Sequence, residues 1–563
     1  MSNARPEIHM APAAGAGGGG LLGGDHFAPK YMVGNVPAGD PAVGQLGAFV
    51  YISDPGDGTG IVAALALAAV TPGDVWIRPG TYDLGAGGVV TPLSIPAGTI
   101  VRGAGPITII RGRTTGNQGV FLVNEGSTLR DMAIVVASSD ATSAGSVAVV
   151  RVIGSCDVAN ITVTFATNAA GALREGIRFE ASLTPLAVAN IVHTVVTATT
   201  TTGGASPTSC YSIMLNAFVT GSDLRAFGGD VGMFSDGSGI VTMSTTLFLN
   251  HLVSCVWWQS VLGGGAMRIN QALWQIGNAA VNPTIANIEQ GGGHTLQSIV
   301  IQGNGTDGCR GLVFDGGGMS NVAVTDIDCS GCSDGIIFGG TNPVDDCGLS
   351  DASVDVSSIA GLARGVAFLH ASSTRCHVTG SSIIALSGAT ATAVVLIGSR
   401  HAVEGNDITQ NSTVLTGAAL DVSSSASSVV GNVVVSNDAY GIRLRSAALR
   451  TVCSANDVEC TAAAPAGGCI VLDDGAARST VGNNVCTQTG VGNVVGAIRV
   501  NSVSCTVGDN SVQVSVTAPV TSGIALGATS ANCTCVGNVC IGSAGAPVAD
   551  VGAGNNVSNN VGA

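Results

Sequence analysis

Pairs of adjacent carboxylates are the strongest candidates for chemistry in this 563-residue chain. They occur in "VDDCGLSD" (344–351) and in "VLDDG" (471–475). Hydrolysis of a glycosidic bond needs two carboxyl groups that flank the bond, about 5–9.5 Å apart. Several further acids lie in the segment just before residue 344, so carboxylates from two neighbouring stretches could converge. The candidate catalytic residues are Asp345, Asp346 and Asp328.

Tryptophans are the second candidate feature, because sugars commonly stack on exposed aromatic rings. Three of the four tryptophans are Trp257, Trp258 and Trp274, the candidate carbohydrate-binding residues. They lie between residues 219 and 296, where the repeat described below is least regular. Irregular segments of a regular scaffold often carry sites. The alternative interpretation is that Trp257 or Trp258 fills a widened part of the core.

The 16 cysteines indicate core packing, and no metal or other cofactor is expected. Four of them precede an apolar repeat position by two residues, so strand alternation points them inward. They are Cys156, Cys347, Cys376 and Cys505. "CSGC" (329–332) is a C-x-x-C motif without the second pair of ligands that a zinc site needs. The thiols stay reduced in a cytoplasm, whereas maturation outside a cell would permit disulfides.

A unit of roughly 27 residues repeats along most of the chain. It is seen in "STVGNNV" (479–485) and "CTVGDNS" (505–511), and it places an apolar residue at 14 equivalent positions. Most intervals are 25–31 residues, and one interval of 77 residues leaves room for two unrecognised copies. The 14 positions are Leu129, Val158, Val188, Val219, Leu296, Val324, Leu349, Val378, Val403, Val430, Val452, Val481, Val507 and Val536.

Two residues after this apolar position, Asn, Asp or Gly occurs in 12 of the 14 copies. These residue types tolerate a left-handed backbone, so the unit is interpreted as strand, corner, strand. The corner residues could be a row of Ca²⁺ or sugar ligands. Because Asn, Asp and Gly interchange freely, we favour a structural ladder in which amides hydrogen-bond from coil to coil. Asn483 is one such corner, and Asp326 and Asp351 are others.

A further strand recurs in each unit as "GIRF" (176–179), "GIIF" (335–338) and "GIAL" (523–526). Three short strands in a unit of this length are typical of one coil of a solenoid. The sequence therefore predicts an all-β fold, a single-stranded right-handed parallel β-helix of roughly sixteen to eighteen coils. At the strand spacing of a β-sheet, the rod would be on the order of 80 Å long.

The N-terminal part of the repeat region resembles a known superfamily. A helix is predicted over 58–70 with Thr59 as its N-cap, followed by "DVWIRPGTYDL" (74–84) and "IVRGAGPITII" (100–110). This series resembles the first coil of the pectate-lyase-like parallel β-helix superfamily, which includes polysaccharide lyases, polygalacturonases, epimerases and phage tailspikes. The resemblance implies the fold, while these activities differ from one member to another.

The resemblance also implies where an enzymatic site would lie, on acids from neighbouring coils of one face. The GHG and R-I-K motifs of polygalacturonases are missing, and "GGHT" at His294 is the nearest match. An eliminase of the superfamily would need an arginine or lysine base beside carboxylates that bind Ca²⁺. The arginines available for that role are Arg310, Arg364 and Arg375.

Charge and composition exclude some binding partners and indicate where the domains begin and end. The formal charge of −15 and the lack of a basic cluster argue against nucleic-acid or anionic-membrane binding. No signal peptide or membrane-spanning run is recognised. We expect a flexible Gly/Ala-rich anchoring arm at 1–45, a cap helix and first coil at 46–112, and the β-helix at 113–563.

Three functions are consistent with these features. The first is a structural or adhesive component of a virus particle, such as a phage tailspike, tail fibre or head decoration protein. It would be a virion-located homotrimer that contacts other virion proteins through its arm and a cell-surface glycan through its rod. The second is a polysaccharide hydrolase or lyase. The third is a cellular surface β-helix protein. The chain is more readily interpreted as a structural protein than as an enzyme.

Overall fold

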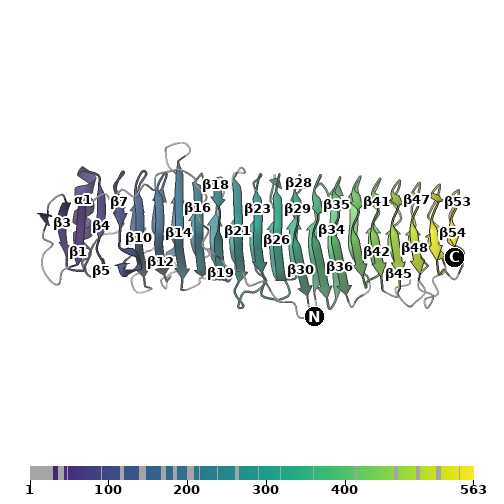
Figure 1. The fold of residues 1–563 in the computed structure, drawn as a ribbon, viewed down its shortest axis with the longest axis horizontal. Coiled ribbons are helices and arrows are strands. Elements are labelled where there is room, and N and C mark those ends of the chain that lie inside the picture. The colour runs from purple at the N-terminus through teal and green to yellow at the C-terminus, as the bar shows by residue number, and fades with distance from the viewer. Residues whose placement is uncertain are drawn as a thin grey trace.

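Each repeat closes into one coil with strands on three faces, and the coils stack into a single rod (Figure 1). This computed structural model describes residues 29–35, 43–46, 49–89, 92–113, 119–137, 147–166, 173–181, 187–199, 208–214, 216–236, 239–259, 265–289, 291–317, 319–358, 361–412, 414, 416–461, 467–489, 495–514, 522–543 and 545–562. Within these ranges, neighbouring coils pair in parallel, which confirms the predicted parallel β-solenoid. No helix in the described ranges is long and apolar enough to cross a membrane.

The third face of the coil is the most regular, because one strand from each coil pairs with the equivalent strand of the next. Its strands run in chain order along the rod, so this ladder fixes the path of the chain. They are β6 (Leu93–Ile95), β9 (Phe121–Val123), β11 (Val147–Ile153), β13 (Leu173–Glu180), β15 (Ser209–Ile213), β17 (Val231–Ser235), β20 (Ser254–Trp258), β22 (Thr284–Ile288), β24 (Arg310–Phe314), β27 (Asp334–Phe338), β31 (Leu362–Phe368), β34 (Thr390–Ser399), β37 (Ala418–Ser425), β40 (Tyr440–Leu444), β43 (Gly468–Leu472), β46 (Gly496–Val500), β49 (Ser522–Leu526) and β52 (Val548–Asp550).

The first and second faces meet at the corner that carries the repeat motif. In several coils one strand continues through this corner: β10 (Thr128–Val136), β12 (Asp157–Phe165), β14 (Val188–Ala198), β16 (Phe218–Gly228), β21 (Ala266–Ile276), β23 (Thr295–Gln302) and β26 (Ala323–Cys332). Strands confined to the first face are β4 (Asp74–Ile77), β7 (Ile100–Arg102), β18 (Ile240–Met243), β29 (Gly348–Ser350), β32 (His377–Thr379), β35 (Ala402–Glu404), β38 (Ser428–Val430), β41 (Val452–Ser454), β44 (Thr480–Gly482), β47 (Thr506–Gly508), β50 (Thr534–Val536) and β53 (Asn556–Ser558).

The second face follows the corner and completes the coil. Its separate strands are β5 (Gly80–Asp83), β8 (Thr108–Arg111), β19 (Thr246–His251), β30 (Ser353–Ser358), β33 (Ser382–Ser387), β36 (Asp407–Ser412), β39 (Val433–Ser436), β42 (Asp457–Cys460), β45 (Val485–Gln488), β48 (Ser511–Val514), β51 (Val539–Ile541) and β54 (Val561–Gly562). A short additional pair is formed by β25 (Met319–Ser320) and β28 (Val344–Asp345).

A cap covers the N-terminal end of the rod (Figure 1). It comprises α1 (Thr59–Val70), β1 (Tyr31–Asn35), β2 (Val43–Leu46) and β3 (Phe49–Asp54), and a 3₁₀ turn η1 (Gly105–Ile107) follows in the next coils. Because β1 pairs with β3 and β4, folded structure begins inside the segment assigned to the arm, whose residues 1–28 lie outside the described ranges.

The predicted helix exists, but its capping residue is different. Gly58 is the N-cap, with φ 83°, and Thr59 is the first helical residue. The buried carboxylate of Asp54 instead accepts hydrogen bonds from the amides of Gly60 (2.9 Å) and Ile61 (3.2 Å). A negative charge at a helix N-terminus is favourable, so this residue from β3 replaces the expected local cap.

Inward side chains stack on their equivalents from coil to coil. Val481 is fully buried and pairs in register with Cys453 on one side and Val507 on the other. On the third face, Phe314, Phe338 and Phe368 form a stack with ring centroids 4.9 and 4.7 Å apart. The two missing repeats are also present, because Met243 and Ile269 lie in register between Gly221 and Leu296, so Gly221 and not Val219 is the equivalent position of its coil.

The corner and the asparagine ladder turn out to be two adjacent positions. Asn483 has φ 56° and turns the backbone as predicted. The ladder is made by its neighbour Asn484, whose Nδ2 donates to the Oδ1 of Asn510 at 2.9 Å and to the carbonyl of Cys453 at 3.0 Å. The ladder comprises the buried residues Asn406, Asn432, Asn456, Asn484, Asn510 and Asn538 and ends at the half-buried Asn560.

Some repeat positions were misaligned by one residue: Val430 lies one residue after the inward position, and Val452 lies one residue before it. Val430 and Val452 are not buried, whereas Val429 and Cys453 beside them are. Two adjacent apolar residues point to opposite sides of a strand, and composition alone does not show which one faces inward. Consequently Asn432 belongs to the ladder, and the left-handed corner of its coil is Gly431 (φ 68°).

Replacing Val481 by Asp should destabilise the rod by roughly 3–5 kcal/mol, because it buries an unpaired charge between two coils. Thermal unfolding followed by circular dichroism measures the effect. Thr480→Asp is the matched control, since Thr480 is the exposed neighbour on the same strand. Equal melting temperatures for Val481→Asp and the wild-type protein would contradict the inward assignment.

The ladder and the corner should respond differently to alanine. Asn484→Ala leaves buried amide and carbonyl groups without partners and should cost roughly 2–3 kcal/mol. Asn483→Ala should cost only about 1 kcal/mol, for the left-handed backbone. Asn483→Gly, which removes that backbone cost, should be nearly neutral. A larger loss of thermal stability in Asn483→Ala than in Asn484→Ala would contradict the assignment of the ladder.

Candidate functional site

Asp345 and Asp346 lie at the corner between the third and first faces, where Arg375 of the next coil binds both. Its Nε and Nη2 donate to the two carboxylate oxygens of Asp346 at 2.8 and 3.0 Å, and Nη2 also contacts Asp345. Thr374 donates a further hydrogen bond to Asp345. Both acids are therefore engaged by the neighbouring coil.

The hydrogen bonds from Arg375, together with its charge, hold the pKa of Asp346 below its ordinary value. A general acid in glycoside hydrolysis needs a raised pKa so that it still holds its proton near neutral pH. Asp346 is therefore an ionised partner of Arg375 and is poorly suited to donate a proton.

Asp328 lies on a different face from these two acids. It is on the second-face part of β26, where partial desolvation and then the nearby charge of Asp355 raise its pKa. Asp355, on β30 of the next coil, pairs in register with Ser330. A carboxyl with a raised pKa beside a second carboxylate is the arrangement that acid–base hydrolysis uses. The sequence did not single out Asp355, because only the stacking of coils brings it next to Asp328.

The remaining acids and bases considered for catalysis lie at other positions, and Asp326 and Asp351 are equivalent residues of adjacent coils. Asp326 and Asp351 are left-handed corners with φ 56° and 53°. Arg364 forms an ion pair with Asp334 at 2.8 Å on the third face, and Arg310 begins β24 of the same face. His294 is buried and accepts a hydrogen bond from the amide of Met267 through Nδ1 at 3.1 Å. The acids of 326–351 thus do not converge on one point.

The three candidate tryptophans have different environments. Trp258 and Trp274 are fully buried, and Trp274 donates to the hydroxyl of Thr246 at 3.1 Å. Trp257 is half-buried on the outer side of the third face, packs edge-to-face against Phe234 and donates to Glu289 at 2.9 Å. Of the three, Trp257 is therefore the one that a ligand on the surface can reach.

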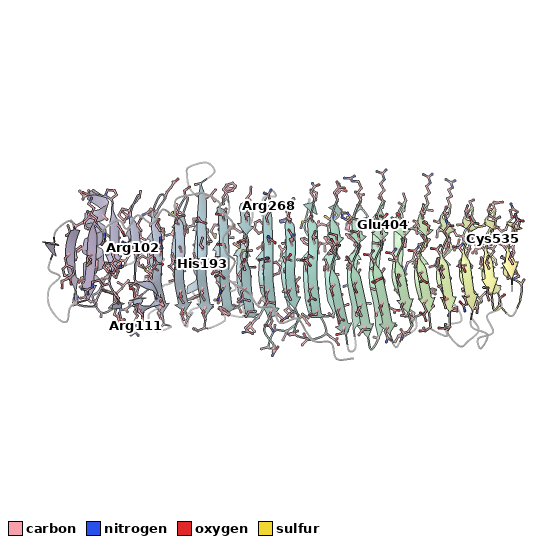
Figure 2. All side chains as sticks on the ribbon, viewed as in Figure 1. Arg102, Arg111, His193, Arg268, Glu404 and Cys535 are labelled. Atoms are coloured by element: carbon pink, nitrogen blue, oxygen red, sulfur yellow. The ribbon has the colours of Figure 1, made fainter. Side chains whose placement is uncertain are left out.

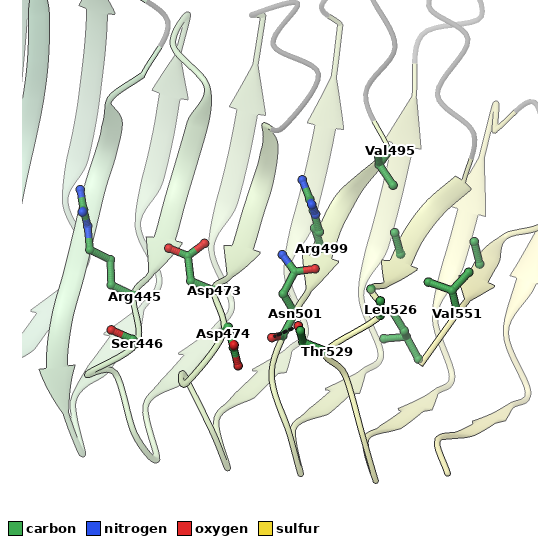
Figure 3. Close-up of a pocket in the computed structure, with 14 residues that line it drawn as sticks. Arg445, Ser446, Asp473, Asp474, Val495, Arg499, Asn501, Leu526, Thr529 and Val551 are labelled. Carbon is green, nitrogen blue, oxygen red and sulfur yellow. Dashed lines mark hydrogen bonds between the residues drawn. The ribbon is translucent and has the colours of Figure 1, made fainter. Parts of the chain in front are cut away.

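A charged groove of about 810 Å³ lies on the outer side of the third face in the C-terminal coils (Figure 3). It opens because Ala525 and Ala549 occupy the outward positions that follow Arg499 along the ladder. Its polar lining includes Arg445, Asp473, Asp474, Arg499 and Asn501. Asp473 forms an ion pair with Arg443, in which Oδ2 of the aspartate lies 2.8 Å from Nε of the arginine. Only the two aspartates were flagged by the sequence, because the arginines belong to other repeats.

A second groove, of about 520 Å³, crosses the first face mainly over the segment 219–296, with Asn190 and Gln297 also in its lining. Thr220, Thr242, Arg268 and Thr295 form its central column, one residue from each successive coil. Figure 2 labels Arg268 at the edge of the rod. Hydroxyl groups and a guanidinium in a row can donate several hydrogen bonds to a polar polymer. The sequence predicted a carbohydrate-binding site between residues 219 and 296. The candidate tryptophans of that prediction do not line this groove.

The cysteines all lie in the core as free thiols. Cys329 and Cys332 of the C-x-x-C motif are both buried, and the Sγ atoms of Cys332 and Cys309 are 3.9 Å apart. Burial raises the pKa of Cys453 to about 12, so this thiol is uncharged at neutral pH. The described residues contain no group of three or more His, Cys, Asp or Glu placed to hold a metal ion.

Replacing Arg375 by Gln should return the pKa of Asp346 to its ordinary value. A lowered carboxyl pKa stabilises the folded state above about pH 4, and the gain is lost as pH falls through the folded-state pKa. The melting temperature of the variant should therefore lie below that of the wild type at pH 7, and the difference should shrink toward pH 2.

Arg310→Gln is the matched control, because Arg310 is exposed and forms no ion pair with the described residues. Its effect on the melting temperature should not depend on pH. If the effect of Arg375→Gln were the same at pH 7 and pH 2, the ion pair would not stabilise the corner.

No protein-family model and no curated protein matches this chain. Solved structures do match. Tailspike protein 3 of bacteriophage CBA120 is 10% identical, covering 66% of this chain and 54% of that one, with a TM-score of 0.33. This chain thus spans about half the length of that tailspike.

Two further solved structures also match. A mannuronic-acid-specific polysaccharide family 6 lyase from human gut microbiota is 11% identical over 66% of this chain and 84% of that one, with a TM-score of 0.32. The tailspike of E. coli bacteriophage HK620, solved with a pentasaccharide, is 11% identical over 88% and 74%, with a TM-score of 0.24. Tailspikes and polysaccharide lyases are among the kinds of protein that the resemblance of the first coil had indicated.

Proposed function

We propose that the protein is a structural and adhesive component of a virus particle, a tailspike, tail fibre or head decoration protein whose rod contacts a glycan. The observation that carries the proposal is the combination of one continuous rod with polar grooves on its outer surface. The core is filled by stacked side chains, so ligands meet the rod only from outside. In contrast, the best acid pair in the sequence, Asp345 and Asp346, is engaged by Arg375.

The two grooves described above have the chemistry of a glycan-binding surface. Arginine and asparagine side chains donate to sugar oxygens, and aspartates accept from sugar hydroxyls. Arg499 and Asn501 supply donors in the C-terminal groove, and Asp474 supplies an acceptor (Figure 3). Both grooves are open along the rod, which suits an extended chain of sugars.

Exposed apolar residues on the second face support assembly of several copies. Val433, Val485 and Val539 occupy equivalent outward positions on alternate coils, with Asp457 and Ser511 on the coils between them, and are 46%, 47% and 40% exposed. Exposed apolar side chains that recur on one face commonly mark a protein contact. We propose that this face lies between the subunits of a homotrimer and that the N-terminal arm contacts other virion proteins.

A polysaccharide-degrading enzyme is the second candidate, and one observation favours it. Asp328 has a raised pKa beside Asp355 on the next coil. In this alternative Asp328 would protonate the leaving oxygen, while Asp355 would act as base or nucleophile.

The first proposal predicts that the protein is found in purified virus particles and binds capsular polysaccharide without shortening it. Mass spectrometry of particles tests the location. Incubation with a panel of bacterial capsules and pectins, followed by assays for new reducing ends and for unsaturated sugars, tests for turnover. We expect the protein in the particles and no products from any polymer.

Absence of the protein from every particle would contradict the virion proposal. Products that disappear in Asp328→Asn and Asp355→Asn, but persist in Asp407→Asn on the same face, would establish the enzyme instead. Loss of the products in Asp345→Ala or Asp346→Ala would place catalysis at the other corner.

A further inference from the structure

The corner between the third and first faces carries a column of residues with left-handed backbone. These residues follow one another along successive coils, because the amide of each donates to a carbonyl of the next coil; Arg450 donates to Ala477 at 3.0 Å and Arg478 to Val503 at 3.1 Å. The column is Asn321, Asp346, Arg375, Arg400, Ala426, Arg450, Arg478, Ser504 and Asn532. We call Arg400, Arg450 and Arg478 the arginine edge.

Arginine is an unexpected residue at such a corner. The φ angles of Arg400, Arg450 and Arg478 are 59°, 56° and 59°. Asn, Asp and Gly are the residues that adopt this conformation readily, and they occupy most corners on the other side of the first face. A repeated residue that opposes the local backbone preference indicates that its side chain is needed.

The same column shows what an arginine at this corner can bind. Arg375 reaches the carboxylate of Asp346, one coil back, with two hydrogen bonds of 2.8 and 3.0 Å. Such two-pronged pairing is the geometry that guanidinium and carboxylate groups favour. The coils before Arg400, Arg450 and Arg478 instead present Arg375, Ala426 and Arg450 at this position. A carboxylate for the arginine edge must therefore come from outside the column.

The arginine edge is exposed and uncompensated. All three side chains are exposed, and none forms an ion pair with the residues that the structure describes. Nitrogen-tipped side chains project from the edge of the rod in the half that carries Glu404 (Figure 2). Arg450 and Arg478 are on adjacent coils, about 4.8 Å apart along the axis. Like charges at this spacing repel, and an anion between them removes the repulsion.

We propose that the arginine edge binds a linear anionic polysaccharide that carries a carboxylate on each sugar and lies parallel to the rod axis. The inference rests on the proposed adhesive function and names the class of glycan. The three arginines span three coil steps, roughly 14 Å, so several carboxylates of one extended chain can be contacted together.

The residues beside the edge favour a sugar polymer over a nucleic acid. Thr480 and Thr506 are exposed on the first face, where their hydroxyls can bond sugar hydroxyls. Val452 is 42% exposed and offers an apolar contact to a sugar ring. Nucleic-acid strands are usually held by stacking on aromatic rings, and the neighbouring described positions His377, Ala402, Ser428, Val452, Thr480 and Thr506 provide no phenylalanine, tyrosine or tryptophan.

The test uses the full-length protein, immobilised polygalacturonate as the acidic polymer and dextran as the uncharged polymer. We expect polygalacturonate to bind, dextran not to bind, and added NaCl to weaken the binding because exposed charges are screened. The triple variant Arg400→Gln, Arg450→Gln, Arg478→Gln should bind polygalacturonate about thirtyfold more weakly or worse, since each arginine near a polyanion contributes about a threefold to tenfold gain.

A second triple variant controls for net charge. Arg78→Gln, Arg113→Gln, Arg310→Gln removes the same charge from exposed positions away from the edge, and it should bind within about twofold of the wild type. Melting temperatures of both variants show that the rod is intact.

Three outcomes would overturn the proposal. The first is a failure of binding to depend on the edge: either the wild-type protein does not bind polygalacturonate, or the triple variant of the arginine edge binds it as well as the charge-control variant does. The second is a change in oligomeric state of the edge variant by sedimentation equilibrium, which would make the edge a contact between copies. The third is tighter binding to single-stranded DNA than to polygalacturonate, again dependent on the edge. None of these bears on whether the protein is found in virus particles, so the proposed function is tested separately.

Discussion

The register between neighbouring coils is the constraint on which the rest of the structure depends. Each strand must pair with the equivalent strand one repeat later, because a shift by one residue would turn every inward side chain outward. Val481 between Cys453 and Val507, and Asn484 between Asn456 and Asn510, show how closely equivalent positions are superposed. The left-handed corner beside the ladder, at Asn483, sets where one strand ends and the next begins.

This register has opposite consequences inside and outside the rod. Inside, stacking like on like is favourable, since amides complete each other's hydrogen bonds and aromatic rings pack in parallel. Outside, the same repetition places like charges on adjacent coils, as at Arg450 and Arg478, where they repel unless an anion joins them. Grooves form by the same rule when a column changes from large to small residues, as from Arg499 to Ala525 and Ala549.

Most of the fold could be predicted because repetition amplifies a weak local pattern. The apolar position, the corner and the third-face strand recur often enough to show the coil, its period and even the two unrecognised copies around Met243 and Ile269. The sequence does not show which of two adjacent residues faces the core. Val452 and Cys453 are equally compatible with the core, and the ladder residue Asn484 stands next to the corner residue Asn483. The helix cap was missed because Asp54 reaches α1 from an adjoining strand.

The candidate site was less predictable, because its residues come from different repeats. Asp345 and Asp346 were visible as a pair, but their partner Arg375 lies one coil away. The arginine edge shows no basic cluster in the sequence, since its members are separated by whole repeats. Trp257 and Trp258 are adjacent and therefore face opposite sides of the strand, and only the structure shows that Trp257 is the outer one.

The central claim is that the core serves the stacking of coils and that function lies in the outward columns. The most direct measurement is an experimental structure of the full-length protein determined with an oligomer of galacturonic acid. The account predicts density for the oligomer along the corner, with carboxylates within hydrogen-bond distance of Arg400, Arg450 and Arg478. An ordered oligomer bound elsewhere on the rod, with these three arginines unengaged, would contradict it.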